Sequence, residues 1–353
     1  MLRAGAIAAV ALVGIVAIAA SEAAAQNEVS FKGKTITMIV GSSAGGGTDA
    51  SGRLIARFLR KYLPGQPNIV IQNMPGANGI TSVNHFVHRT QPDGLTVMVN
   101  SNSQIDPIVY RNSSAQYDPK SLRFVGGIGR GGTIIFISAK AEPRLYNKSE
   151  EPIVIGSIDA TPRAAMQPAV WGIEYLGWNA KWVVGYPGTN DVMMAFDRGE
   201  VELTSTGNIF QIQDRLNGGQ LKILNQSGAI ENGKLVSRAE FGNAPLFTEQ
   251  MKGKIADPVA QKALDYWIAL SNADKWVALA PHTANNILET YREAFRKLSS
   301  DKELLDVGER ISDGFSPIAA RDFEGLVRTL ADTPPEATDY IKGLMRKQGL
   351  RVQ

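Results

Sequence analysis

The chain alternates between short apolar runs and longer segments in which apolar residues recur at helical spacing. Apolar runs at residues 35–40, 68–72 and 95–99 have the length and composition of buried strands. Between them, the apolar spacing predicts helices over residues 48–62 and 80–89. Three strands separated by two helices predict a βαβαβ unit and therefore a parallel sheet.

A second group of strand-length runs predicts a smaller α/β domain in the middle of the chain. The glycine-rich stretch 126–132 before it is too irregular for a dinucleotide-binding motif, and we interpret it as a crossover between domains. After about residue 245 the pattern becomes mostly helical. The expected strands of this part of the chain are 133–137, 153–158, 182–184, 201–204, 221–225 and 276–280, and the expected helices are 191–198, 258–270, 284–298, 301–311 and 319–349.

The first strand runs into a turn of small residues, Gly41-Ser42-Ser43-Ala44-Gly45-Gly46-Gly47-Thr48-Asp49. Glycine and serine let backbone N–H groups converge without bulky side chains between them. The helix that follows adds its unpaired first-turn amides and the positive end of its dipole, so the turn predicts an anion-binding site. Because parallel strands end at one edge of a sheet, we expect this site to face a crevice.

The amino-acid composition excludes several kinds of catalytic and metal site. The chain has 353 residues, of which 44% are hydrophobic and 20% charged, and this length suggests about two domains. A net charge of +3 gives no indication of a nucleic-acid partner. The absence of cysteine excludes disulfides, thiol catalysis and cysteine-ligated metals. His85 and His88 are spaced for one helix face, but no carboxylate is spaced to complete a metal site with them, so we expect no metal and no cofactor.

The N-terminal residues 1–25 have the features of a signal peptide. Arg3 precedes an apolar run at residues 4–20, and an A-x-A-like cleavage site ends at Ala25. A membrane anchor or a buried helix is the alternative interpretation of the same run. We expect an exported, periplasmic protein whose mature form starts near Gln26, and a cysteine-free composition fits that location.

The stretch Gly41–Gly45 also matches the G-x-S-x-G nucleophile elbow, which makes a serine hydrolase using Ser43 the main alternative function. Such an enzyme needs a later histidine, and His282 is the one available; no HGGG-type oxyanion loop is present. No Gly-Lys-Ser/Thr follows the glycines, so a P-loop is excluded. Small-residue turns on two domains, without a catalytic set, favour a protein that closes on a small anion.

Several motifs resemble the tripartite tricarboxylate transporter substrate-binding proteins, the Bug-type receptors. They are Ala44-Gly45-Gly46-Gly47-Thr48-Asp49, Asn73-Met74-Pro75-Gly76-Ala77-Asn78-Gly79, Pro92-Asp93-Gly94-Leu95-Thr96, Gly156-Ser157, Tyr186-Pro187-Gly188 with Asp191, and Gly199-Glu200-Val201-Glu202-Leu203. Their order and spacing extend over essentially the whole mature chain and are closest in its first part.

The resemblance implies a type II periplasmic-binding-protein fold, two α/β lobes joined by a hinge with the ligand in the cleft. Lobe 1 would comprise residues 26–132 and 245–353, and lobe 2 residues 133–244. It implies a monomer without enzymatic activity or cofactor, which captures a small organic carboxylate and delivers it to the integral-membrane permease subunits of a tripartite transporter. An exported solute sensor is a further alternative.

The resemblance also implies which residues bind the ligand, mainly through backbone groups of the turns. In lobe 1 they are Ser42, Ser43, Ala44, Gly45, Gly46 and Thr48, with Asn78, Gly79, Ser101 and Asn102 as neighbours; in lobe 2 they are Gly156, Ser157, Ala160, Thr161, Gly188 and Asn208. We expect Asp49 to brace its helix start.

The second lobe departs from the family pattern. Residues 158–163 read Ile-Asp-Ala-Thr-Pro-Arg where relatives have a Gly/Ser-rich turn followed by histidine. An acidic Asp159 beside a carboxylate site is unfavourable unless Arg163 or an amine of the ligand neutralises it. The identity of the ligand therefore stays open.

Overall fold

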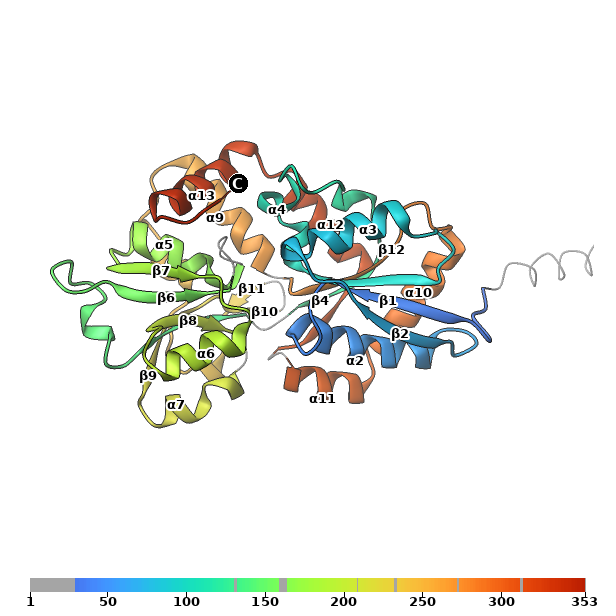
Figure 1. The fold of residues 1–353 in the computed structure, drawn as a ribbon, viewed down its shortest axis with the longest axis horizontal. Coiled ribbons are helices and arrows are strands. Elements are labelled where there is room, and N and C mark those ends of the chain that lie inside the picture. The colour runs from blue at the N-terminus through green and yellow to red at the C-terminus, as the bar shows by residue number, and fades with distance from the viewer. Residues whose placement is uncertain are drawn as a thin grey trace, which may run out of the picture.

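The computed structural model describes residues 29–129, 132–158, 164–207, 209–231, 234–271, 273–311 and 314–352. The predicted signal peptide, residues 1–25, lies outside them. Two β-sheets, each covered by helices, form the two lobes of the molecule (Figure 1). No helix of the described segments has the length and apolar character needed to cross a membrane.

The first sheet has the strand order β13-β4-β12-β3-β1-β2. The expected parallel unit is present, since β1 pairs in parallel with both β2 and β3. The sheet as a whole is mixed, however, because β12 runs antiparallel to β3 and β4, and β13 antiparallel to β4. The strands are β1 (Thr35–Val40), β2 (Asn68–Asn73), β3 (Thr96–Ser101), β4 (Arg123–Gly129), β12 (Lys275–Leu279) and β13 (Ser316–Ala319).

The connection to the second lobe explains why β12 runs antiparallel to its neighbours in the sheet. The chain leaves this sheet at the C-terminal end of β4 and returns to it at Lys275, which lies opposite Ser101 and Ile128. A strand that enters a sheet at the edge where its neighbours end must run against them. The parallel unit predicted for β1 to β3 is confirmed, and β12, for which no direction was predicted, runs antiparallel to its neighbours.

Helices cover both faces of this sheet, and alternate residues of β1 face opposite helix layers. Ile36, Met38 and Val40 pack in one apolar cluster with α2, α10 and α11, whereas Ile39 packs in another with α3 and α12 (Figure 1). These helices are α2 (Gly47–Tyr62), α3 (Ile80–Arg89), α10 (Asn285–Leu298), α11 (Lys302–Ile311) and α12 (Ala320–Ala331).

The glycine-rich stretch interpreted as a crossover begins inside strand β4, so that prediction was wrong for residues 126–129. Its glycines make room for two aromatic rings on opposite faces. A Cβ on Gly126 would lie 2.3 Å from Phe295 of α10, and one on Gly127 would lie 2.1 Å from Phe323 of α12. Glycine is used here for close helix–sheet packing, which sequence reasoning mistook for irregular structure.

The second sheet has the order β7-β6-β8-β5-β9. β6 is parallel to β7 and β8, and β5 is antiparallel to β8 and β9. The predicted strands of this region are present with shifts of a few residues, while the hairpin β10–β11 was not expected. The elements are β5 (Ile134–Ser138), β6 (Ile153–Ser157), α5 (Gln167–Tyr175), β7 (Ala180–Val184), α6 (Thr189–Asp197), β8 (Leu203–Thr206), α7 (Gln213–Asn217), β9 (Leu221–Gln226), β10 (Ala229–Glu231) and β11 (Lys234–Val236).

The helical tail begins with α8 (Phe247–Met251) and α9 (Pro258–Ser271). Asp257 caps α9 by accepting the N–H of Val259 at 2.9 Å. The single helix expected over 319–349 was wrong, because α12 ends at Ala331 and α13 (Pro335–Lys347) starts after Pro334. Two adjacent prolines lack N–H donors and cannot continue a helix.

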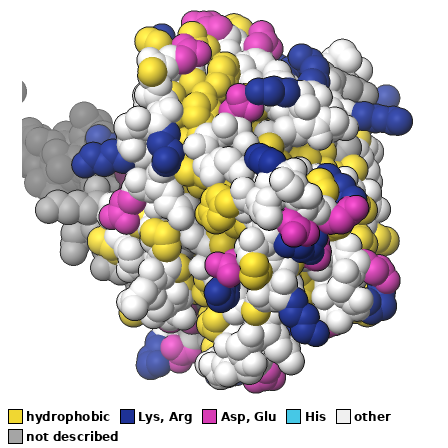
Figure 2. All heavy atoms as spheres, turned by 90° about the vertical axis from the view of Figure 1, so that its left-hand side faces the viewer, with side chains coloured by type: hydrophobic (Ala, Val, Ile, Leu, Met, Phe, Trp, Pro, Cys, Tyr) yellow, Lys and Arg dark blue, Asp and Glu magenta, His cyan; other side chains and the backbone are white. Residues whose placement is uncertain are grey.

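Helices α9 and α13 lie beside α5, although their sequence was assigned to lobe 1 (Figure 1). The rings of Trp171 in α5 and Tyr340 in α13 are 6.1 Å apart, and Trp182 of β7 donates its Nε1–H to Gln348 at 3.0 Å. The predicted residue boundaries of the lobes stay a prediction. On the surface of this side of the molecule, acidic and basic side chains are intermixed (Figure 2).

A buried carboxylate, Asp106, lies at the start of the short helix α4 (Pro107–Tyr110). It accepts hydrogen bonds from the Ile108 N–H at 2.8 Å and from the Tyr266 hydroxyl of α9. Burial raises the pKa of Asp106 to about 6, and these two hydrogen bonds only partly offset that effect.

Asp106 therefore makes stability depend on pH. The folded state binds this proton more tightly than the unfolded state, so the free energy of unfolding falls as pH rises through about 4 to 6. Asp106→Asn keeps an acceptor but removes the titration, and we expect the stability of the variant relative to wild type to rise by about 2–3 kcal/mol between about pH 4 and pH 7. Urea unfolding across this range measures the difference; a constant difference would contradict the prediction.

Candidate functional site

A cleft of about 850 Å³ lies between the two sheets. Its walls are the strand ends and the turns that follow them, which come from both lobes. They include the turn 41–48 after β1, residues 75–79 after β2, residues 100–104 at the end of β3, Gly156–Ile158 after β6, residues 186–193 around the start of α6, residues 204–207 of β8 and Asp274–Lys275 at the start of β12.

All the predicted ligand-binding residues within the described segments line this cleft. They are Ser42, Ser43, Ala44, Gly45, Gly46, Thr48, Asn78, Gly79, Ser101, Asn102, Gly156, Ser157 and Gly188. Ala160, Thr161 and Asn208, together with Asp159 and Arg163, lie outside the described residues. The fold thus brings segments far apart in sequence to one place, and their contact with a ligand stays a prediction.

The turn after β1 lines the cleft and contains backbone donors without an acceptor. Gly45 has φ +84°, a left-handed conformation that favours glycine, and Gly46 is the N-cap of α2. Among the described residues, no acceptor is hydrogen-bonded to the N–H groups of Ser43, Ala44 and Gly46. Unpaired amides at a helix N-terminus are the feature that binds anions in many proteins.

Asp49 braces this turn, as expected. Its Oδ2 accepts the Gly45 N–H and the Arg53 Nε–H, both at 2.9 Å, and its Oδ1 accepts the Asn73 amide at 2.8 Å. Asn73 also donates to the Ser42 carbonyl at 2.9 Å. Burial raises the pKa of Asp49, but the hydrogen bonds from Arg53, Gly45 and Asn73 outweigh it, so the pKa lies below its usual value and the carboxylate is ionised.

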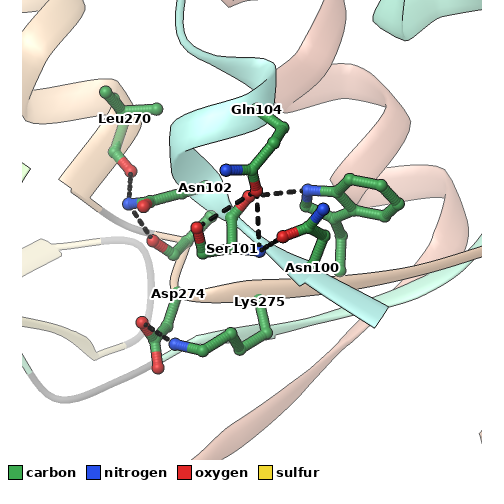
Figure 3. A network of polar contacts seen from close by, with 9 residues as sticks. Asn100, Ser101, Asn102, Gln104, Leu270, Asp274 and Lys275 are labelled. Atoms are coloured by element: carbon green, nitrogen blue, oxygen red, sulfur yellow. Dashed lines mark hydrogen bonds and ion pairs between the residues drawn. The ribbon is translucent and has the colours of Figure 1, made fainter. Parts of the chain in front are cut away.

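A polar network fixes the end of β3 behind the cleft wall (Figure 3). The Ser101 N–H and hydroxyl both donate to Gln104 Oε1, at 3.0 and 3.1 Å. The Asn102 side-chain amide donates to the carbonyls of Ala273 at 2.7 Å and Leu270 at 3.3 Å. Ser101 and Asn102 thus border the cleft while these side-chain groups hold the scaffold together.

Asp274 and Lys275 line the cleft and were not predicted. The Lys275 Nζ is 2.5 Å from Asp274 Oδ1, and each side chain is 9% exposed (Figure 3). The Asp274 N–H donates to Ile128 at 2.8 Å, and its carbonyl accepts the Asn102 N–H at 3.0 Å. They lie at the cleft because β12 pairs antiparallel with β3. The residues around Asp274 do not indicate this long-range pairing, so the sequence did not predict it.

In the second lobe, two predicted residues have structural roles as well. A Cβ on Gly156 would lie 2.7 Å from Val201, so glycine is needed there for packing. Gly188 is the N-cap of α6, at the same position that Gly46 has in α2. Cleft-lining residues of this lobe that were not predicted as binding residues include Met166, Tyr186, Asn190, Asp191, Met193, Thr204, Ser205, Thr206 and Gln211. Of these, Tyr186 and Asp191 were quoted only as motif residues.

The geometry argues against the serine-hydrolase alternative. Ser43 lies at the cleft edge of the first sheet, where β12 begins. His282 follows the other end of β12, whose Leu279 pairs with Val97 near the start of β3. The strand separates Ser43 from His282 by roughly 15–20 Å, far beyond hydrogen-bond reach. In the described segments, no three His, Asp or Glu residues are grouped to bind a metal.

Part of the chain is similar in sequence to two known proteins. The chain is 34% identical over 127 residues to a UPF0065 protein encoded in a gbd 5′ region of Cupriavidus necator, and 36% identical over 93 residues to protein BugT of Bordetella pertussis. These matches span 35% and 26% of this chain, and 35% and 28% of the respective relatives. No family model matches the chain.

Solved structures match over much more of the chain. The periplasmic binding protein BugD superposes with a TM-score of 0.63 at 18% identity, covering 90% of this chain and 99% of BugD. A Rhodopseudomonas palustris protein with adipate gives 0.61 at 18% identity, covering 90% and 97%. MatC from Rhodopseudomonas palustris with bound malate gives 0.57 at 16% identity, covering 88% and 98%.

These likenesses, at 16–18% identity, show the fold. The resemblance to Bug-type proteins is confirmed in sequence by the match to BugT over 26% of the chain. The chain is therefore similar to Bug-type periplasmic binding proteins and has their two-lobed α/β fold.

Proposed function

We propose that this protein is an exported solute-binding protein that holds a small organic carboxylate in the cleft between its lobes. The observation that carries the proposal is the set of unpaired amides before the start of α2, in a turn that lines the cleft and is braced by Asp49. A carboxylate bound there accepts several N–H bonds and interacts with the positive end of the helix dipole.

Two further observations support a small carboxylate as the ligand. Structural neighbours hold malate and adipate, which are small carboxylates. The cleft volume of about 850 Å³ accommodates a molecule of that size together with water. Residues 1–25 supply the sequence features for export, and we propose a periplasmic monomer that delivers its ligand to the permease subunits of a tripartite transporter.

Removing one amide tests the anion site directly. Gly46 has φ −79°, which proline adopts, so Gly46→Pro deletes the N–H while residue 46 keeps its φ. Because proline also restricts the left-handed Gly45 before it, the thermal unfolding of the variant is compared with that of wild type. We expect affinity for a bound carboxylate to fall about ten- to a hundredfold, because a charge-assisted hydrogen bond is lost. Calorimetric titration with an organic-acid panel that includes malate and adipate measures this.

Gly46→Ala is the matched control, since it keeps the N–H and its Cβ would lie an ordinary 3.6 Å from the Ser43 carbonyl. It should bind within a few-fold of wild type. Equal losses in both variants would show that the Gly46 amide is not the contact.

Asp49→Asn tests the brace behind the site. An amide has one acceptor oxygen where the carboxylate has two, so either Gly45 and Arg53 or the Asn73 amide loses its acceptor. We expect a loss of about 1–3 kcal/mol in the free energy of unfolding and a weaker carboxylate affinity. Arg60→Gln on the exposed face of the same helix is the control and should change neither quantity. If the free energy of unfolding and the carboxylate affinity of Asp49→Asn equal those of wild type, Asp49 does not brace the turn.

Transport and sensing make different predictions for cells. If the protein delivers its ligand to a permease, uptake of that ligand should require both the protein and the permease, and Gly46→Pro should reduce it in proportion to affinity. Uptake that persists without the protein would favour the sensor alternative.

A further inference from the structure

The two helices that begin at the cleft share a local pattern. Helix α2 has Gly46 as N-cap and Asp49 as its third residue, and helix α6 has Gly188 as N-cap and Asp191 as its third residue. Both helix starts line the cleft, one from each lobe. Each therefore combines a glycine that exposes backbone amides with a carboxylate in the first turn.

The two carboxylates differ in how their charge is balanced. Asp49 is paired with Arg53, four residues later, and its side chain is only 4% exposed. Four residues after Asp191 stands Ala195, which is buried and uncharged. Within the described segments, no hydrogen bond or ion pair reaches the Asp191 carboxylate, and its Oδ2 lies 3.4 Å from the position of a Cβ on Gly188.

The charge of Asp191 therefore acts on the cleft. Among the described residues that line it, the charged ones are Asp191, Asp274 and Lys275. Asp274 and Lys275 form a close ion pair, so their charges largely cancel. The start of α6 already carries its own anion, and a ligand carboxylate placed there would be repelled, whereas an ammonium group would be attracted.

We propose that the cleft selects a small molecule with a carboxylate at one end and an ammonium group at the other. The carboxylate binds the amides at the start of α2, and the ammonium group binds Asp191 at the start of α6. Asp191 is then the residue that distinguishes amino carboxylates from dicarboxylates. This inference rests on the proposed function and adds that the second charged group of the ligand is positive.

Calorimetric titration of the wild-type protein with matched pairs tests the class of ligand. The pairs are β-alanine with succinate and γ-aminobutyrate with glutarate, in which an ammonium replaces one carboxylate, together with α-amino acids of comparable size. At least one amino carboxylate should bind about tenfold more tightly than its dicarboxylate counterpart. If no amino carboxylate binds, or the dicarboxylates bind more tightly, the inference is wrong; tight dicarboxylate binding leaves the proposed function standing.

Asp191→Asn tests the residue. It should weaken amino carboxylate binding about ten- to a hundredfold and strengthen dicarboxylate binding, so that the preference shifts toward the dicarboxylate. The matched control is Asp214→Asn, which removes an exposed carboxylate from the first turn of α7 in the same lobe, away from the cleft. Asp191→Ser, which also lacks the charge, gives the same comparison if Asp191→Asn fails to fold. An unchanged preference, or the same change in the control, would overturn the assignment.

Discussion

The ion pair between Asp49 and Arg53 is the interaction on which the candidate site depends. A helix start that is to receive an external anion cannot also leave a bare carboxylate there, because the two negative charges repel. Arg53 balances Asp49, and the hydrogen bonds from Gly45 and Asn73 fix where that carboxylate lies. The turn is thereby held in shape from behind while other amides remain open toward the cleft.

The course of the chain concentrates these groups at one edge of the sheet. β1, β3 and β4 end there, and β12 begins there when the chain returns from the second lobe. The same crossover that makes the sheet mixed also brings Asp274 and Lys275 beside Ser101 and Asn102. The point at which the chain passes between the lobes therefore determines both the strand directions of the sheet and the residues that meet at the site.

Sequence reasoning succeeded where the structure is determined locally. The apolar runs of β1 to β3, the small-residue turn and the helix predicted over residues 258–270 follow from patterns within a few residues. It failed where distant segments decide the outcome. Gly126 and Gly127 are strand residues because Phe295 and Phe323 pack onto them, and no local rule relates these positions. Asp191 was seen as part of a motif, but its unbalanced charge becomes visible only beside the paired Asp49 across the cleft.

The packing of α9 and α13 against α5 limits how the cleft can open. Trp171 and Trp267 belong to one buried apolar cluster that joins these helices, and separating them would expose both side chains to water. If the lobes move, the axis of rotation has to pass close to this cluster. In Figure 1 the starts of α2 and α6 face each other on the side away from α9 and α13. A ligand held by both helix starts would thus join the two lobes at a second place, apart from this cluster.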